Sequence, residues 1–292
     1  MKPAPFEYAA PEDLEQAVGL LGQHGDDAKL IAGGQSLVPL LAFRLAAPQV
    51  LVDLNRVSEL SHLRLDGDTL VVGALARHRD VETFPGLARR CPMIADGVSL
   101  IGHVAIRNRG TVGGSIAHAD PAAEWPSILL ALDGEVDARG PRGTRTIAAG
   151  ELFDTYFTTA LHPDEVLTEI RLRLPTGRVG SAYLELSRRH GDFAITGVGT
   201  VLVLGDGDRI RDARVVLIGV RDTAVRSAAA EVVLRDGEAG EQLFGEAAEA
   251  IDGEIDPVSD LHGSSDYRRH IAKVLVRRAL ARALDRAREG GD

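Results

Sequence analysis

The chain has 292 residues, a formal net charge of −10 at pH 7 and one cysteine, Cys91. This length allows two or three domains, and 45% hydrophobic with 26% charged residues is ordinary for a folded globular protein. The negative charge disfavours nucleic acid or an anionic membrane as the main partner, and a single thiol excludes a disulfide, a cysteine-ligated zinc site or an iron–sulfur cluster held by this chain alone.

The N-terminal part predicts a small β-α-β lobe over residues 1–57. The expected elements are a helix that opens at 11–13 and ends at Gly22 or Gly25, a strand at 29–31, a helical turn to Leu41 and a buried strand at 49–54. The first residues lack the apolar segment of a secretory signal, and no apolar run reaches the roughly 18 residues of a membrane span. We therefore expect a cytoplasmic protein without an integral membrane segment.

Residues 58–176 predict a second lobe that ends at the turn-forming residues Pro175, Thr176 and Gly177. Asp66-Gly67-Asp68 between two apolar runs is a strong hairpin signal. The other expected elements are helices from 78 to 98 interrupted near Pro85 and Pro92, a helix at 124–132, and strands at 135–138, 145–148 and 166–174.

Residues 177–292 predict a third unit in which strands come first and helices follow. The expected elements are strands at 182–186, 197–204 and 213–219, a hairpin turn at 205–208, and a helix from Tyr267 to about Arg288. We expect this helix to bury Ile271, Val274, Leu275 and Leu284 and to turn its charges outward. The grouping of strands favours an α+β fold over a doubly wound sheet.

Two glycine-containing segments stand out, glycine loop 1 (residues 32–37) and glycine loop 2 (residues 107–115). Each holds a Gly-Gly pair, Gly33-Gly34 and Gly113-Gly114, near a serine. Glycine adopts positive φ and has no Cβ, so backbone N–H groups can close on ligand oxygens. One such pair is more often a tight turn, but two predict the two walls of one pyrophosphate site. The chain has neither a P-loop nor a Rossmann fingerprint.

These segments carry a family resemblance. Ala32–Leu37 and Arg107–Ser115 resemble the two FAD-binding loops of the medium subunit of molybdenum hydroxylases, such as carbon monoxide dehydrogenase and xanthine dehydrogenase. Arg188–Ala194 resembles a motif that opens the family's C-terminal domain. The resemblance implies a two-lobed FAD-binding domain of the vanillyl-alcohol-oxidase-like type (1–57 and 58–176), followed by a smaller α+β C-terminal domain (177–292).

The resemblance also implies a set of FAD contacts. The expected contacts are Ala32, Gly33, Gly34, Gln35, Ser36, Leu37, Thr111, Val112, Gly113, Gly114, Ser115, Ala117, His118, Asp120, Glu124, Leu167 and Tyr183. Glu124 matches an acidic residue that touches the ribityl hydroxyls, and Leu167 matches an apolar residue against the isoalloxazine ring, with plain core as its alternative. Tyr183 matches a flavin-side position, where the family often has a nearby lysine and this chain has Leu184 and Glu185.

Two residue patterns leave simpler interpretations open. His118, Asp120 and Glu124 have metal-ligand chemistry, but Asp120 before Pro121 is more typical of a helix cap. The segment 188–193 is either a solvated turn with an Arg–Asp pair or a rigid loop near a ligand. We predict no metal site and no catalytic acid, base or nucleophile.

The functional hypothesis is an FAD-binding electron-transfer subunit. By resemblance, its partners are a large subunit with a molybdenum cofactor and a small subunit with two [2Fe–2S] clusters, in a heterotrimer that is single or doubled. Electrons would pass from the clusters to the flavin and on to an external acceptor, a quinone, NAD or oxygen. The alternatives are a stand-alone FAD-dependent reductase or oxidase of the same FAD-binding class, and a non-catalytic ligand-binding module.

Overall fold

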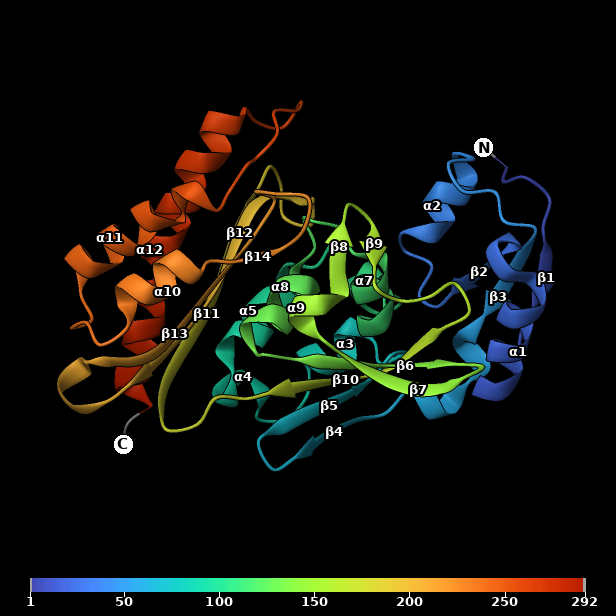
Figure 1. Ribbon diagram of the computed structural model, residues 1–292, viewed down its shortest axis with the longest axis horizontal. Helices are drawn as coiled ribbons and strands as arrows, with labels where there is room; N and C mark the ends of the chain where they lie inside the picture. Colours follow the sequence, from blue (N-terminus) through green and yellow to red (C-terminus); the bar gives the residue numbers. More distant parts are fainter. Residues whose placement is uncertain (1, 291–292) are drawn as a thin grey trace.

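The computed structural model describes residues 2–290, and the chain runs through three main sheets along the length of the molecule, with a separate two-stranded ribbon (Figure 1). The strands of each sheet come from one continuous part of the sequence, which confirms the α+β class. The limits 1–57, 58–176 and 177–292 remain our proposed domain boundaries. Within residues 2–290, no helix has the length and apolar character needed to cross a bilayer.

The first sheet has three parallel strands in the order β1–β3–β2. Its part of the chain contains β1 (Glu7–Ala9), α1 (Leu14–His24), β2 (Ala28–Ile31), α2 (Leu37–Ala42) and β3 (Val50–Asp53), with 3₁₀ turns at Gly25–Asp27, Leu54–Arg56 and Ser58–Leu60. Helix α1 begins where the Asp13 carboxylate accepts the Gln16 amide at 2.8 Å. The sequence did not predict β1, because three residues are too few to show an alternating pattern.

The central sheet is antiparallel in the order β4–β5–β10–β6–β7, and helices cover one of its faces (Figure 1). The strands are β4 (Leu63–Asp66), β5 (Thr69–Gly73), β6 (Glu135–Gly140), β7 (Gly143–Ala148) and β10 (Val166–Arg173), and β8 (Phe153–Thr155) with β9 (Thr158–Thr159) forms a separate ribbon. The helices are α3 (His78–Glu82), α4 (Leu87–Arg90), α5 (Pro92–Leu100), α6 (Val104–Arg107), α7 (Val112–His118), α8 (Glu124–Ala131) and α9 (Ala149–Leu152). The predicted hairpin is confirmed, since Asp66 pairs with Thr69.

The third sheet is antiparallel in the order β11–β12–β13–β14 and has helices on both faces. Its part of the chain contains β11 (Arg178–Ser187), β12 (Ala194–Leu204), a 3₁₀ turn (Asp206–Asp208), β13 (Ile210–Ile218), β14 (Val225–Arg226), α10 (Ala228–Leu234), α11 (Glu241–Ala250), a 3₁₀ turn (Ile251–Gly253) and α12 (Ser265–Glu289). Every residue of β12 is buried, because α12 packs on one side of the sheet while α5 and α8 pack on the other. The third sheet therefore shares its core with the central part of the molecule.

Helix α12 buries Leu275 and Leu284 as expected, but the other two expected core residues are less buried. Ile271 and Val274 are only half-buried. The buried stripe consists largely of alanines together with Leu275, Val276, Leu280 and Leu284. Small side chains let the helix backbone meet the sheet at Gly180, where a Cβ would lie 1.7 Å from the Ala283 carbonyl oxygen.

The charges of α12 also differ from the expectation, because two of its arginines point inward. Arg268 is 7% exposed and donates to the Ile195 carbonyl. Its Nη2 also donates to Asp260 Oδ2 at 2.7 Å. Arg286 donates to both carboxylate oxygens of Asp96 on α5, at 2.6 and 3.0 Å. These two ion pairs tie the last helix to the sheet and to the central helices.

A buried ion pair positions the segment that leads into glycine loop 2. Arg107 is 5% exposed and grips Glu82 with two hydrogen bonds, Nε to Oε2 at 3.0 Å and Nη2 to Oε1 at 3.2 Å. Its Nη1 donates to the carbonyls of Ile101 and Gly102, each at 3.1 Å. Arg107 thus has a structural role, and it holds α6 against α3.

We expect Arg107→Ala to lower the free energy of unfolding by about 3 kcal/mol, because it leaves the Glu82 carboxylate inside the protein without its main partner. Arg79 pairs with the same carboxylate from a half-exposed position at 2.9 Å. Its replacement by alanine should cost less than about 1 kcal/mol. Urea unfolding of the two variants measures the difference, and equal losses would contradict the structural role assigned to Arg107.

Candidate functional site

Glycine loop 1 connects β2 to α2 and presents unused backbone donors. The amides of Gly33, Gly34, Gln35 and Ser36 donate to no other described residue. Gly34 has φ +73°, a conformation that L side chains rarely adopt. The side-chain amide of Gln35 folds back and donates to the Gly33 carbonyl at 3.0 Å. This loop is therefore a local cluster of free N–H groups of the kind that binds phosphate oxygens.

Glycine loop 2 differs from the expected cradle of free amides. Gly113 and Gly114 lie in the first turn of α7, and neither has positive φ. The Gly113 amide donates to the Ala74 carbonyl and the Gly114 amide to the Thr111 hydroxyl, at 3.0 and 3.1 Å. Because Thr111 caps the helix, the protein itself uses these donors, and the second wall offers instead the bare Cα of Gly114 and the Ser115 side chain.

Close packing explains the glycine at position 113. A Cβ there would lie 2.6 Å from the Cβ of Ala74 and 2.7 Å from its carbonyl oxygen. Gly113 thus lets α7 sit directly on the residue that follows β5. The structure buries Val112 completely as well, so neither residue is available to a ligand.

The two glycine loops lie against each other. A Cβ on Gly33 would lie 2.4 Å from the Arg109 carbonyl oxygen and 2.7 Å from the Cα of Gly110. A Cβ on Gly114 would lie 4.0 Å from the Cβ of Ala32. Segments almost 80 residues apart therefore form one continuous surface, as the two-wall hypothesis requires.

Two side chains that the sequence analysis missed connect these loops. Asn55 donates to the Ala32 carbonyl at 2.8 Å and accepts from Arg77 at 2.7 Å. Arg77 also donates to the Arg109 carbonyl. The Asn55–Arg77 bridge thus joins the end of β2 to glycine loop 2 through hydrogen bonds to backbone carbonyls. Asn55 and Arg77 lie in irregular segments without a motif, so their roles had no local signal.

The exposed side of α7 continues the surface away from the loops. Ala117 is exposed and His118 is half-buried, with its ring centroid 5.1 Å from that of Phe157. Burial lowers the pKa of His118, the charge of Asp120 opposes this shift, and the charge of Lys29 adds to it. Phe157 lies in the β8–β9 turn with φ +54°, which is unusual for an aromatic residue.

Asp120 has a different local role from the predicted one. Its carboxylate accepts from the Ala122 amide at 2.9 Å, whereas α8 begins at Glu124 with Ala123 in the capping position. The prediction that Asp120 caps this helix is wrong, because an extra turn separates the two. Among the described residues, no three His, Cys, Asp or Glu side chains are grouped as metal ligands.

Two expected flavin contacts are instead part of the core. Tyr183 is 1% exposed, packs against Gly97 and Gly199, and shares a 3.1 Å hydrogen bond with Ser127. Leu167 is 5% exposed and belongs to the same hydrophobic cluster. Both side chains point into the packed interior of the fold, so the structure does not place them on the surface formed by the glycine loops.

Glu124 and its neighbour Glu185 are acidic side chains in a largely buried region. Glu124 is 9% exposed at the start of α8, and burial together with the charge of Glu185 raises its pKa to about 8. Burial also raises the pKa of Glu185 to about 7. One carboxylate oxygen of Glu185 is buried without a hydrogen-bond partner.

The segment 188–193 is an exposed turn between β11 and β12. Asp192 forms no ion pair with Arg188 or Arg189 among the described residues, so the expected Arg–Asp pair is absent. Gly191 has φ +89° and packs against the His103 ring, and Phe193 is 73% exposed.

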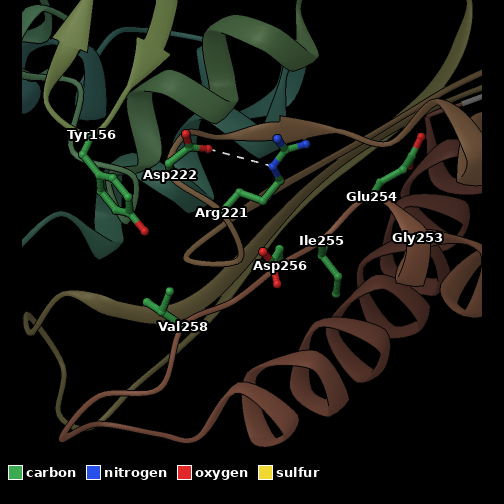
Figure 2. Close-up of a pocket in the computed structure, with 8 residues that line it drawn as sticks. All are labelled: Tyr156, Arg221, Asp222, Gly253, Glu254, Ile255, Asp256 and Val258. Carbon is green, nitrogen blue, oxygen red and sulfur yellow. Dashed lines mark ion pairs between the residues drawn. The ribbon is translucent and has the colours of Figure 1, made fainter.

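A cavity of about 390 Å³ lies between the β8–β9 turn, the segment after β13 and residues 253–258. Figure 2 labels the residues that line it. Tyr156 lines one side, and Arg221 lies 3.9 Å from Asp222. Asp256 and Glu254 add two further carboxylates, although Glu254 already accepts from the Ala229 amide at 3.1 Å. A lining with more acidic than basic groups is unsuited to a diphosphate, so the free amides of glycine loop 1 fit that ligand better.

Comparisons with known proteins agree with this geometry. Residues 4–175 match the FAD binding domain in molybdopterin dehydrogenase, and residues 181–283 match the CO dehydrogenase flavoprotein C-terminal domain. The chain is 43% identical to the 6-hydroxypseudooxynicotine dehydrogenase complex subunit alpha of Paenarthrobacter nicotinovorans, over 99% of this chain and 97% of that one. It is 38% identical to the carbon monoxide dehydrogenase medium chain of Hydrogenophaga pseudoflava, over 96% and 97%.

Solved structures show the same similarity in three dimensions. A carbon monoxide dehydrogenase from Hydrogenophaga pseudoflava that lacks the Mo-pyranopterin moiety superposes with a TM-score of 0.95, at 39% identity, over 98% of this chain and 99% of that one. Quinoline 2-oxidoreductase from Pseudomonas putida 86 superposes with a TM-score of 0.93, at 35% identity, over the whole of both chains.

We expect Gly33→Ala to weaken FAD binding about tenfold and to cost about 1–3 kcal/mol of stability, because the new Cβ would push glycine loop 1 off the Arg109 carbonyl. Gly19 in α1 is a matched control, since a Cβ there meets nothing within 4 Å. Gly19→Ala should bind FAD normally and be stabilised by about 0.5–1 kcal/mol. Fluorescence titration with FAD measures both, and unchanged binding by Gly33→Ala would refute the contact between loops.

A second prediction concerns Tyr183. We expect Tyr183→Phe to lose about 1 kcal/mol of stability with its hydrogen bond to Ser127, and to change the FAD affinity less than about twofold. Urea unfolding and FAD titration of the same sample give both values. A large loss of affinity at unchanged stability would restore Tyr183 as a cofactor contact.

Proposed function

The chain belongs to the flavoprotein medium-chain family of molybdopterin dehydrogenases, and we propose that it is the electron-transfer subunit of such a complex. It is an FAD-binding oxidoreductase subunit, as its relatives are. In the proposed role it accepts electrons from a small [2Fe–2S] partner and passes them to an external acceptor. A large molybdenum-cofactor partner would oxidise the substrate, within a cytoplasmic heterotrimer.

The observation that carries this proposal is the joined pair of glycine loops with its unused amide donors. Bound FAD supplies the redox chemistry, because it exchanges electrons one or two at a time. The chain's own residues hold and orient it. In the proposed pose the amides of Gly33 to Ser36 bind the diphosphate, while Ser115 and the bare surface of Gly114 form the opposite wall.

The same proposal assigns positions to the remaining contacts. Ala117, His118 and Asp120 follow the loops along the surface toward Glu124, whose carboxyl oxygens can bind the ribityl hydroxyls. Leu167 and Tyr183 are left out of the proposed contacts because they are inside the core. No side chain of this arrangement is proposed as an acid, base or nucleophile.

The names of the relatives support a subunit rather than a stand-alone enzyme. They include a dehydrogenase complex subunit, a nicotine 6-hydroxylase medium subunit and a carbon monoxide dehydrogenase medium chain. The single cysteine is consistent with this division, since iron–sulfur clusters need several thiolates and must be carried by another chain.

We expect the purified chain to be yellow and to release FAD, rather than FMN, on heat denaturation. Co-expression with the chains encoded beside it should yield a complex that contains molybdenum and iron. Absorption spectroscopy, chromatography of the released nucleotide and metal analysis measure these outcomes. A flavin-containing chain that remains without partners and turns over a substrate by itself would instead support the stand-alone reductase or oxidase.

A further inference from the structure

Helix α8 and strand β11 bring two carboxyl side chains toward the same buried region. The hydrogen bond between Ser127 and Tyr183 fixes the helix against the strand. Glu124 lies one turn before Ser127 on α8, and Glu185 lies two residues after Tyr183 on the same face of β11. The two carboxyl groups therefore lie on facing sides of the helix and the strand, near enough for the charge of Glu185 to raise the pKa of Glu124.

The surroundings of this pair contain no compensating cation. Glu124 is nine-tenths buried, and neither Glu124 nor Glu185 takes part in an ion pair among the described residues. The neighbouring strand β12 contributes Gly197, where a Cβ would lie 3.2 Å from the Cβ of Glu185. The pair is thus enclosed on this side by glycine and apolar side chains.

The charged groups on the other packed elements do not neutralise it. Asp120, on the turn before α8, adds a further negative charge near Glu124. On α7, burial lowers the pKa of His118 and so disfavours its cationic form, although the charge of Asp120 opposes this shift. On α5, Asp96 is already paired with Arg286 of α12 at 2.6 Å, and with Arg282 of the same helix at 3.6 Å.

Two desolvated carboxylates without a cation cannot both ionise at low cost. One bound proton removes most of that cost, because it lowers the charge of the pair by one. The proton also turns one carboxyl group into a hydrogen-bond donor. The unpartnered oxygen of Glu185 is available to accept such a hydrogen bond. A carboxylic acid can thus donate a hydrogen bond to a carboxylate, whereas two carboxylates can only accept hydrogen bonds.

We propose that Glu124 and Glu185 form a carboxyl pair that shares one proton near neutral pH and thereby sets the charge beside the FAD site. The sharing of the proton depends only on this chain. The effect on the flavin rests on the proposed function, in which Glu124 lies next to the cofactor. Loss of the proton would add one negative charge there and disfavour electron uptake.

The first test measures the pH dependence of stability in the full-length chain without FAD. The folded chain holds the proton at a pKa raised above the ordinary carboxyl value of 4.5, to about 7–8, whereas the unfolded chain releases it near 4.5. The stabilisation by this proton is complete below pH 4.5 and is lost as the pH rises through about 8. The melting temperature should therefore fall across this window.

Glu185→Gln and Glu124→Gln should each flatten this fall, so that the variants melt above the wild-type chain at pH 8 but not at pH 5. Glu151→Gln, at an exposed position on α9, should retain the wild-type slope. Infrared spectroscopy at neutral pH should show a protonated-carboxyl band that is weaker in both pair variants and unchanged in the control. A wild-type slope in Glu185→Gln together with an unchanged band would overturn the proposal.

The second test uses the FAD-loaded chain and compares the pH dependence of the flavin midpoint potential. The wild-type potential should fall more steeply between pH 6 and 8 than that of Glu185→Gln. Equal slopes would refute the influence on the flavin. The first test would still decide whether the two carboxyl groups share a proton. A chain that binds no FAD would refute the proposed function, and the melting and infrared results would still decide the carboxyl pair.

Discussion

The site depends on a backbone-to-backbone contact between Gly33 and the Arg109–Gly110 peptide. No side chain fits at position 33 while this contact exists, since even a Cβ would overlap the Arg109 carbonyl. The two loops are therefore in direct backbone contact. The Asn55–Arg77 bridge reinforces the contact with directed hydrogen bonds from a third part of the chain. The relative position of the two walls is therefore set before any ligand binds, which lowers the entropic cost of binding.

The two walls contribute in chemically different ways. Glycine loop 1 leaves its amides free and uses positive φ at Gly34 to expose them, so it is the donor side. In glycine loop 2 the amides donate hydrogen bonds to Ala74 and Thr111, and the glycines allow close packing instead. The same dipeptide thus serves anion binding in one loop and helix packing in the other. Similar sequence motifs in one site need not have the same function.

Besides holding the cofactor in position, the chain can influence it through nearby charges. In the proposed role, the chain acts on the flavin by position and by the charge that surrounds it. The third sheet is important here, because β12 is buried on both faces and fixes β11 against α5 and α8. That packing brings Glu185 toward Glu124, buries Glu124 and leaves Glu185 half-buried. The protonation of this pair therefore depends on the joint between the central and C-terminal parts of the molecule.

The sequence by itself determined the α+β class, the family, the cofactor and most of the elements, because hairpin turns, helix starts and glycine motifs are local signals. It also showed that iron–sulfur clusters must lie elsewhere, since thiols can be counted. Only the tertiary structure decided which amides are free, that Asn55 and Arg77 join the loops, and that Tyr183 and Leu167 are inside the core. These features depend on residues far apart in the chain, and periodicity along the chain carries no information about which buried faces meet. The alanine face of α12 is a further case, because its selection depends on the close approach to Gly180 rather than on hydrophobicity.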